Sequence, residues 1–172
     1  MKMKAVVLNG TGGPEALELA EVELPWPRRP TDVLVRLRTA ALNPADSYFR
    51  TFGPYLQSDG ACILGHDGAG LVEEVGPTVT RVRPGDSVCF CNGGIGGDPG
   101  TYAEFAVVPE TQLVRMAASV DFDKAAALPL VLITAWEALY DRAGVEAGEQ
   151  VLIHAGAGGT GHIAVQLACL RG

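Results

Sequence analysis

The chain has 172 residues, of which 48% are hydrophobic and 19% are charged, so it holds enough apolar material for a packed core. Its formal net charge of −7 gives no electrostatic basis for binding nucleic acid or an anionic membrane. The four cysteines lack the spacing of a disulfide framework, and no stretch is long and apolar enough to span a bilayer. We therefore expect a cytoplasmic protein that binds neither nucleic acid nor membrane.

Short strands separated by turn residues dominate the first part of the chain. Val33, Val35 and Leu37 alternate with Arg36 and Arg38 over residues 33–42, which is typical of a strand with one buried face. The expected strands cover residues 4–8, 17–24, 33–42, 71–75, 87–91, 102–108 and 113–116, and a glycine-rich loop covers 93–100. Many short strands with turn signals between them favour a small β-barrel or β-sandwich.

Helical patterns interrupt this series and then replace it. Asn43 in a capping position followed by Pro44 indicates a short helix over residues 44–50. Further helices are expected over 122–128, with Asp121 as the cap, and over 130–142. We place a domain boundary near residue 125, with a β-rich domain over 1–124 and the start of an α/β domain over 125–172.

A strand, a glycine turn and a helix are predicted near the end of the chain. The apolar run Val151–Ala155 is followed by three glycines, Gly156, Gly158 and Gly161, which have the spacing G-x-G-x-x-G. A helical pattern comes after them. Glycines at this spacing permit a tight turn, a close approach to a diphosphate and close packing of the helix. The alternative is a glycine turn without a ligand. The residue that would read the ribose, about 20 positions further on, lies beyond Gly172, so we expect a truncated enzyme.

Several segments, in order along the chain, resemble the medium-chain dehydrogenase/reductase superfamily. Residues 65–70, 75–79 and 84–88 are similar to the signature of its catalytic domain, and residues 127–130, 134–139 and 155–161 are similar to its quinone oxidoreductase branch. The resemblance implies a mixed fold: a β-rich GroES-like barrel followed by the first βα unit of a Rossmann domain. It also implies a longer family chain that binds NADPH, or NADH, and forms a homodimer.

The same family has zinc-dependent and zinc-independent branches. His66 stands where the zinc branch has a ligand histidine, and Asp67 stands where it has an acid. The two cysteines expected in that branch are replaced by Asn43 and Leu130, and neither side chain binds Zn²⁺ tightly. We therefore expect no metal, and interpret His66 as a hydrogen-bonded histidine at the start of a strand.

Without a metal, the negative charge that develops on a carbonyl oxygen during hydride transfer needs hydrogen-bond donors. The resemblance places the segment after residue 42 beside the nicotinamide and substrate, where Asn43 and Tyr48 are the donors. Asp46 is expected to brace the helix, and N-capping with packing is the alternative role for the whole set. Thr134 matches a family threonine beside the nicotinamide amide, with an ordinary helix threonine as the alternative. The expected cofactor residues are Asn43, Thr134, Gly156, Ala157, Gly158, Gly159, Thr160 and Gly161.

The function expected from these residues is reduction of a small-molecule quinone or α,β-unsaturated carbonyl by hydride transfer from NAD(P)H, without zinc. We expect the 172-residue chain to be inactive alone. Two alternatives remain open at this point. One is a zinc-dependent alcohol dehydrogenase, and the other is a non-enzymatic GroES-like interaction module.

Overall fold

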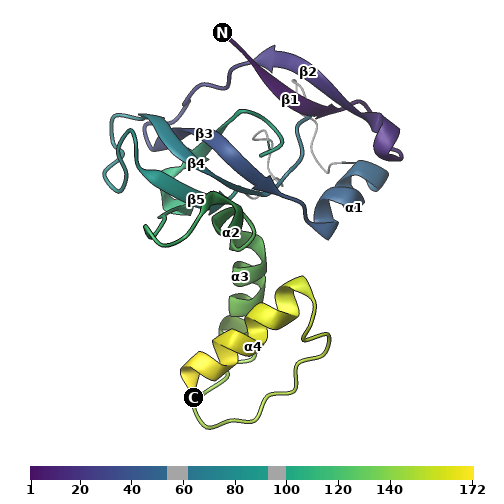
Figure 1. Ribbon diagram of the computed structural model, residues 1–172, viewed down its shortest axis with the longest axis vertical. Helices are drawn as coiled ribbons and strands as arrows, with labels where there is room; N and C mark the ends of the chain where they lie inside the picture. Colours follow the sequence, from purple (N-terminus) through teal and green to yellow (C-terminus); the bar gives the residue numbers. More distant parts are fainter. Residues whose placement is uncertain (54–61, 93–99) are drawn as a thin grey trace. The chain divides into compact units, whose positions relative to one another are not determined.

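A computed structural model describes residues 1–53, 62–92 and 100–172 of the chain. The chain divides into two compact units, Met1–Ala127 and Leu128–Gly172 (Figure 1). The division falls within three residues of the boundary expected near residue 125. Each unit is described below by itself.

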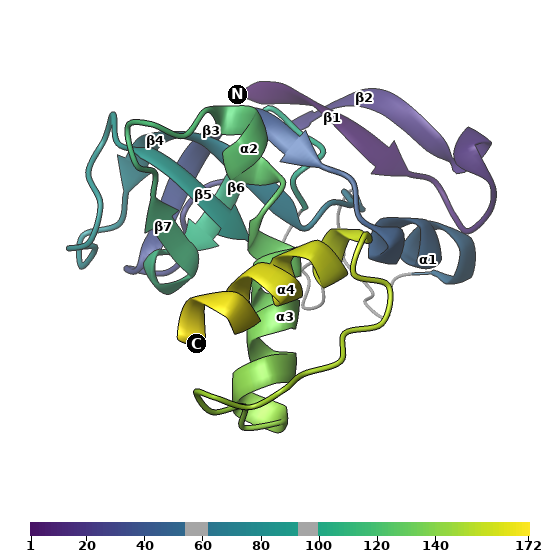
Figure 2. The ribbon, with the colours of Figure 1, turned by 60° about the horizontal axis from the view of Figure 1, so that its bottom comes forward.

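The first unit is built on antiparallel strands. A five-stranded sheet has the order β6-β3-β4-β5-β7, and β1 pairs with β2 in a separate two-stranded sheet. Figure 2 shows β1 and β2 as a ribbon of their own, and α1 following the end of β3. The strands are β1 (Lys2–Leu8), β2 (Leu17–Glu23), β3 (Asp32–Ala41), β4 (Asp67–Val75), β5 (Ser87–Cys91), β6 (Phe105–Pro109) and β7 (Leu113–Arg115). The expectation of a β-rich first domain is confirmed.

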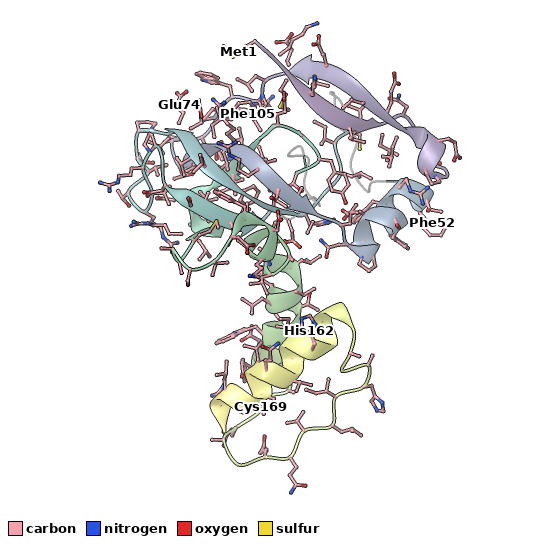
Figure 3. All side chains as sticks on the ribbon, in the orientation of Figure 1. Met1, Phe52, Glu74, Phe105, His162 and Cys169 are labelled. Carbon is pink, nitrogen blue, oxygen red and sulfur yellow. The ribbon has the colours of Figure 1, made fainter. Side chains whose placement is uncertain are left out.

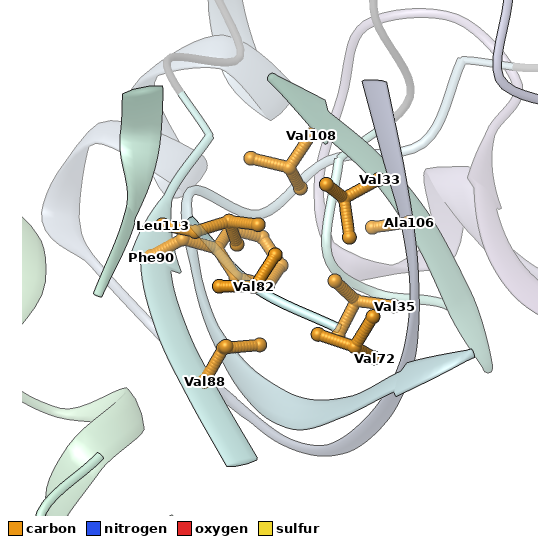
Figure 4. Close-up of a cluster of buried hydrophobic side chains, with 9 residues drawn as sticks. All are labelled: Val33, Val35, Val72, Val82, Val88, Phe90, Ala106, Val108 and Leu113. Atoms are coloured by element: carbon orange, nitrogen blue, oxygen red, sulfur yellow. The ribbon is translucent and has the colours of Figure 1, made fainter. Parts of the chain in front are cut away.

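Alternating apolar residues of the five-stranded sheet form the core of this unit. Val33 and Val35 of β3 and Val88 of β5 are completely buried, and Phe90 is the largest of the fully buried side chains. Figure 4 shows them pointing into a common interior with side chains from the other strands and from the turn before β5. The cluster comprises Val33, Val35, Val72, Val82, Val88, Phe90, Ala106, Val108 and Leu113. Burial of each large member contributes about 1.5–3 kcal/mol to stability, which holds the sheet as one body.

Strand β4 begins earlier than the sequence pattern predicts. We expected it over residues 71–75, but it starts at Asp67 and pairs with both β3 and β5. Asp67 is followed by Gly68, Ala69 and Gly70, and at Gly70 there is no room for a larger side chain: a Cβ there would lie 2.1 Å from the carbonyl oxygen of Arg36. Most of the expected glycine loop, residues 93–99, lies outside the described residues.

Three short helical segments and α1 complete the first unit. Helix α1 (Pro44–Phe52) follows β3, and α2 (Phe122–Ala126) is capped by Asp121, whose side chain accepts the N–H of Lys124 at 2.8 Å. Both caps were predicted. The other two segments are the 3₁₀ turns η1 (Pro14–Ala16) and η2 (Glu110–Gln112).

The second unit consists of helices that pack on one another. Helix α3 (Pro129–Trp136) continues as a π-helix, η3 (Glu137–Arg142), in place of the single helix expected over 130–142. Helix α4 (Gly159–Arg171) packs on them through a core of Ala135, Leu139, Ile163 and Ala164. The Tyr140 hydroxyl donates to the carbonyl of Leu167 at 2.7 Å, which ties η3 to α4.

The strand predicted over Val151–Ala155 is not formed. A strand exists only through hydrogen bonds to a neighbouring strand, and residues 128–172, all of them described, contain no other strand. The segment therefore runs as an irregular chain, with Leu152 83% exposed. None of the helices in the described ranges has the length and apolar character needed to cross a membrane.

A substitution at Gly70 tests the close approach of β3 and β4. Gly70→Ala places a methyl group against the Arg36 carbonyl, so we expect the free energy of unfolding to fall by about 3 kcal/mol. Gly12→Ala is the control, because its nearest neighbour, Glu15 Oε1, is at 3.5 Å. Urea unfolding of both variants measures the difference. Equal stability of the two would contradict the described packing.

Candidate functional site

The start of α1 is fixed by its own sequence. Asn43 occupies the cap position with extended backbone, and Pro44 supplies the first helical residue, which needs no N–H. Asp46, three residues after the cap, accepts the Asn43 backbone N–H through Oδ2 at 2.7 Å. This is the reciprocal arm of a capping box, and it turns the Asp46 carboxylate inward.

The Asp46 carboxylate is buried and accepts three hydrogen bonds. Besides Asn43, it binds Nδ1 of His66 through Oδ1 at 2.8 Å and the hydroxyl of Tyr102 through Oδ2 at 2.7 Å. Burial raises the pKa of Asp46, but the hydrogen bonds from His66, Tyr102 and Asn43 together bring it below its ordinary value. Burial and the bond to Asp46 raise the pKa of Tyr102, so that its hydroxyl stays a donor.

A second buried carboxylate belongs to Asp67, the first residue of β4. Asp67 is 1% exposed and accepts Nδ2 of Asn43 at 2.9 Å. Its register partner on β5 is Cys91. Burial, and then the charge of Asp67, raise the pKa of Cys91 to about 12, so the thiol is protonated at neutral pH. Burial also raises the pKa of Cys89, which leaves neither cysteine as a thiolate nucleophile.

These contacts define a buried network in the first unit, formed by Asn43, Asp46, His66, Asp67 and Tyr102. The structure thus brings Asn43 together with Asp46, His66 and Asp67, which the sequence analysis had considered separately. Asp46 does brace the helix, as expected, and His66 is hydrogen-bonded at the start of its strand. Tyr102 was missed as a site residue, because it lies 56 positions from Asp46 and no local pattern marks it.

Tyr48 lies on α1 beside an exposed aromatic side chain. Its ring is 4.8 Å from that of Phe52, and the two residues are 47% and 70% exposed. Figure 3 shows Phe52 at the outer end of the helix. Arg50, further along α1, donates to the carbonyl of Gly12 and so ties the helix to the turn after β1.

The glycine turn in the second unit opens α4, with Gly158 at the cap position. Gly158 N–H donates to the Ala155 carbonyl at 2.9 Å, and a Cβ on Gly161 would lie 2.1 Å from that same oxygen. Ala155 has a φ of 54°, a left-handed conformation that is rare outside glycine. The first N–H groups of an α-helix have no partner within the helix, which is the property by which helix N-termini bind phosphate groups.

Thr134, the other expected cofactor residue of this unit, lies exposed on α3. Its hydroxyl donates to the carbonyl of Leu130 at 2.8 Å, within its own helix. The Thr134 oxygen can therefore accept a hydrogen bond from a ligand more readily than it can donate one.

The residues in the positions of a zinc site do not fit that metal. Asn43 donates its amide to Asp67, and Leu130 is apolar. His66 uses Nδ1 for Asp46. In the ranges 1–53, 62–92 and 100–172, no three His, Cys, Asp or Glu side chains are grouped as metal ligands.

The charge of Asp46 should make stability depend on pH. Its pKa is lowered in the folded state, so its contribution is complete above the ordinary value of 3.8 and is lost as the pH falls through the folded pKa. At pH 7 we expect the free energy of unfolding of Asp46→Asn to be about 3 kcal/mol lower than that of the parent. Denaturant unfolding at pH 7 and below pH 3 measures both proteins. If the parent and Asp46→Asn differed in unfolding free energy by the same amount at both pH values, the Asp46 carboxylate would not be ionised in the folded protein.

Comparisons with known proteins agree with the geometry of the first unit. Residues 29–118 match the family described as the alcohol dehydrogenase GroES-like domain. A quinone oxidoreductase of Pseudomonas aeruginosa is 38% identical over 165 residues, which cover 96% of this chain and 49% of that protein. The chain thus spans about half the length of the curated relatives that it matches.

Solved structures give the same result. An alcohol dehydrogenase superfamily protein from Novosphingobium aromaticivorans has a TM-score of 0.91 and 43% identity, over 99% of this chain and 51% of its own. The quinone oxidoreductase from Coxiella burnetii has a TM-score of 0.87 and 36% identity, over 100% of this chain and 55% of its own. The chain contains a β-rich GroES-like domain and is similar to members of the quinone oxidoreductase branch. It therefore belongs to the medium-chain dehydrogenase/reductase superfamily.

Proposed function

We propose that the full-length protein is a zinc-independent oxidoreductase that reduces a quinone or an α,β-unsaturated carbonyl with NAD(P)H. The observation that carries this proposal is the turn before α4, where Gly161 leaves no room for a Cβ and Gly158 is the cap residue of the helix. This is the form that the diphosphate of a dinucleotide requires. Relatives named quinone oxidoreductase support the substrate class.

The proposed cofactor residues are those of the turn, Gly156 to Gly161, together with Thr134 and Asn43. We propose NADPH in preference to NADH, on the resemblance to the quinone oxidoreductase branch. A homodimer, a cytoplasmic location and a domain boundary at residue 125 are also part of the proposal.

When bound, the nicotinamide supplies the hydride. The chain's part is to stabilise the negative charge that then develops on the substrate oxygen. Asn43 has a second amide hydrogen besides the one given to Asp67, and Tyr48 has a hydroxyl, so both are proposed as donors. One well-placed donor of this kind lowers the barrier by about 3 kcal/mol.

A zinc-dependent alcohol dehydrogenase is the second candidate, because His66 and Asp67 are both present at the start of β4. Asn43 and Leu130 argue against it, since neither replaces a thiolate. Metal analysis after dialysis tests this point. One zinc per chain that survives dialysis would replace the first proposal with the second.

Gly158→Ala tests the proposed cofactor site. A Cβ there meets the Ala155 carbonyl oxygen at 3.2 Å, a contact that the turn can absorb with a small shift. The added methyl group lies at the N-terminus of α4, where we propose that the diphosphate binds. We expect the affinity for NADPH to fall by at least about tenfold, which corresponds to about 1.4 kcal/mol. Calorimetry of the full-length protein measures the affinity, and Gly12→Ala is the control.

The parent protein is also assayed for NADPH oxidation with quinones and enones. The proposal predicts turnover by the parent and weaker NADPH binding by Gly158→Ala. A parent that neither binds nor oxidises NADPH or NADH would refute the proposed function.

A further inference from the structure

Two different carboxylates hold Asn43, one at its backbone and one at its side chain. Asp46 Oδ2 accepts the Asn43 backbone N–H at 2.7 Å, whereas Asp67 Oδ2 accepts the side-chain nitrogen Nδ2 at 2.9 Å. The two acceptors belong to different elements, because Asp46 lies on α1 and Asp67 is the first residue of β4. The backbone position of Asn43 and the direction of its amide are therefore fixed by separate groups.

The sheet itself keeps Asp67 in place. Asp67 pairs with Ala41 of β3 on one side and with Cys91 of β5 on the other, and it is 1% exposed. Asn43 follows Ala41 by two residues, so the pairing that places Asp67 also places the segment that carries Asn43. Asn43 is half-buried, so part of this residue is accessible from outside while its partner is enclosed.

At least two donors face the Asp67 carboxylate. One is the amide nitrogen of Asn43, and the other is the Cys91 thiol. Burial, the charge of Asp67 and the hydrogen bond to Asp67 raise the pKa of Cys91 to about 12, so the thiol keeps its hydrogen at neutral pH. Hydrogen-bond donors favour the ionised form of a carboxylate, which accepts and cannot donate. The amide of Asn43 must therefore turn its nitrogen, and not its oxygen, toward Asp67.

The direction of one amide N–H bond fixes the direction of the other. The amide group is planar and carries two hydrogens on its nitrogen, so the hydrogen bonded to Asp67 sets where the second one points. Half a rotation of the amide would bring its oxygen against the Asp67 carboxylate, and both are acceptors. Since a donor stabilises a developing oxyanion only when its direction is set in advance, the Asp67 bond is what makes Asn43 suitable for this task.

We propose that Asp67 is a positioning residue for the reduction, whose carboxylate holds the Asn43 amide so that its second hydrogen is presented to the carbonyl oxygen of the substrate. This inference rests on the proposed function, in which Asn43 is a donor to that oxygen. Asp67 does not touch the substrate and acts through Asn43. The sequence placed Asp67 only at the position of an acid in the zinc branch.

Four variants of the full-length protein separate positioning from a structural role. Asp67→Leu removes the acceptor and leaves an apolar side chain that branches at the same carbon. Asn43→Ala removes the donor, and the double variant removes both. The matched control is Asp32→Leu, because Asp32 is also a buried carboxylate of this sheet, 4% exposed, and accepts the backbone N–H groups of Arg28 and Arg29 instead.

The measured quantity is kcat for NADPH oxidation with 1,4-naphthoquinone or cyclohex-2-enone as the probe. We expect kcat to fall about 100-fold in Asn43→Ala and at least about tenfold in Asp67→Leu, because one well-placed donor is lost or no longer held. In the Asn43→Ala background, Asp67→Leu should leave kcat unchanged, because the group that it positions is absent. Asp32→Leu should lower the unfolding midpoint and leave kcat unchanged.

Proton–nitrogen correlation spectra of the Asn43 side-chain amide report the same contact without turnover. A hydrogen bonded to a carboxylate resonates downfield, so we expect the two amide hydrogens of Asn43 to be widely separated in the parent. In Asp67→Leu the downfield signal should move upfield. The signal that is missing from the spectrum of Asn43→Ala identifies this amide.

The outcomes separate this inference from the proposed function. If Asp67→Leu kept kcat within about threefold of the parent, or lowered it by the same factor with and without Asn43, the positioning role would be wrong and the reductase function would stand. If Asp67→Leu did not fold, the parent spectrum would decide, because nearly coincident hydrogens of the Asn43 amide would overturn the role of Asp67. A parent that reduces no quinone or enone with either cofactor would refute the proposed function and this inference with it.

Discussion

One buried carboxylate, that of Asp46, holds the candidate site together. It accepts hydrogen bonds from the start of α1, from the start of β4 and from Tyr102, three segments far apart in the chain. A buried charge is stable only when it is paired and hydrogen-bonded. The three donors and the carboxylate therefore need one another, and α1 cannot shift from β4 without leaving buried polar groups unpaired. This constraint fixes the orientation of Asn43 and His66.

The network also supports the proposal of a reaction that needs no metal. Where the zinc branch has a thiolate, this chain has Asn43, whose amide bonds the buried Asp67. The second amide hydrogen of Asn43 is the group in this network that we propose as a donor to the substrate oxygen. Donors are what a carbonyl oxygen requires as it gains charge.

Local features were predictable from sequence, and features that depend on distant partners were not. The cap at Asn43, the cap at Asp121 and the alternating strand β3 follow from neighbouring residues, and the structure confirms them. The early start of β4 was missed because Gly68, Ala69 and Gly70 give no apolar signal. The prediction of a strand over Val151–Ala155 was wrong, because an apolar run becomes a strand only beside another strand. The bonds from Asp46 to His66 and Tyr102 span 20 and 56 positions, so only the fold reveals them.

The protonation of the His66 ring tests this account most directly. Long-range ¹H–¹⁵N correlation spectra of the full-length protein at neutral pH distinguish the two ring nitrogens and report which of them carries hydrogen. The account predicts a hydrogen on Nδ1, held by Asp46. A neutral ring with its hydrogen on Nε2 alone would contradict it, because Asp46 would then have no hydrogen to accept from His66.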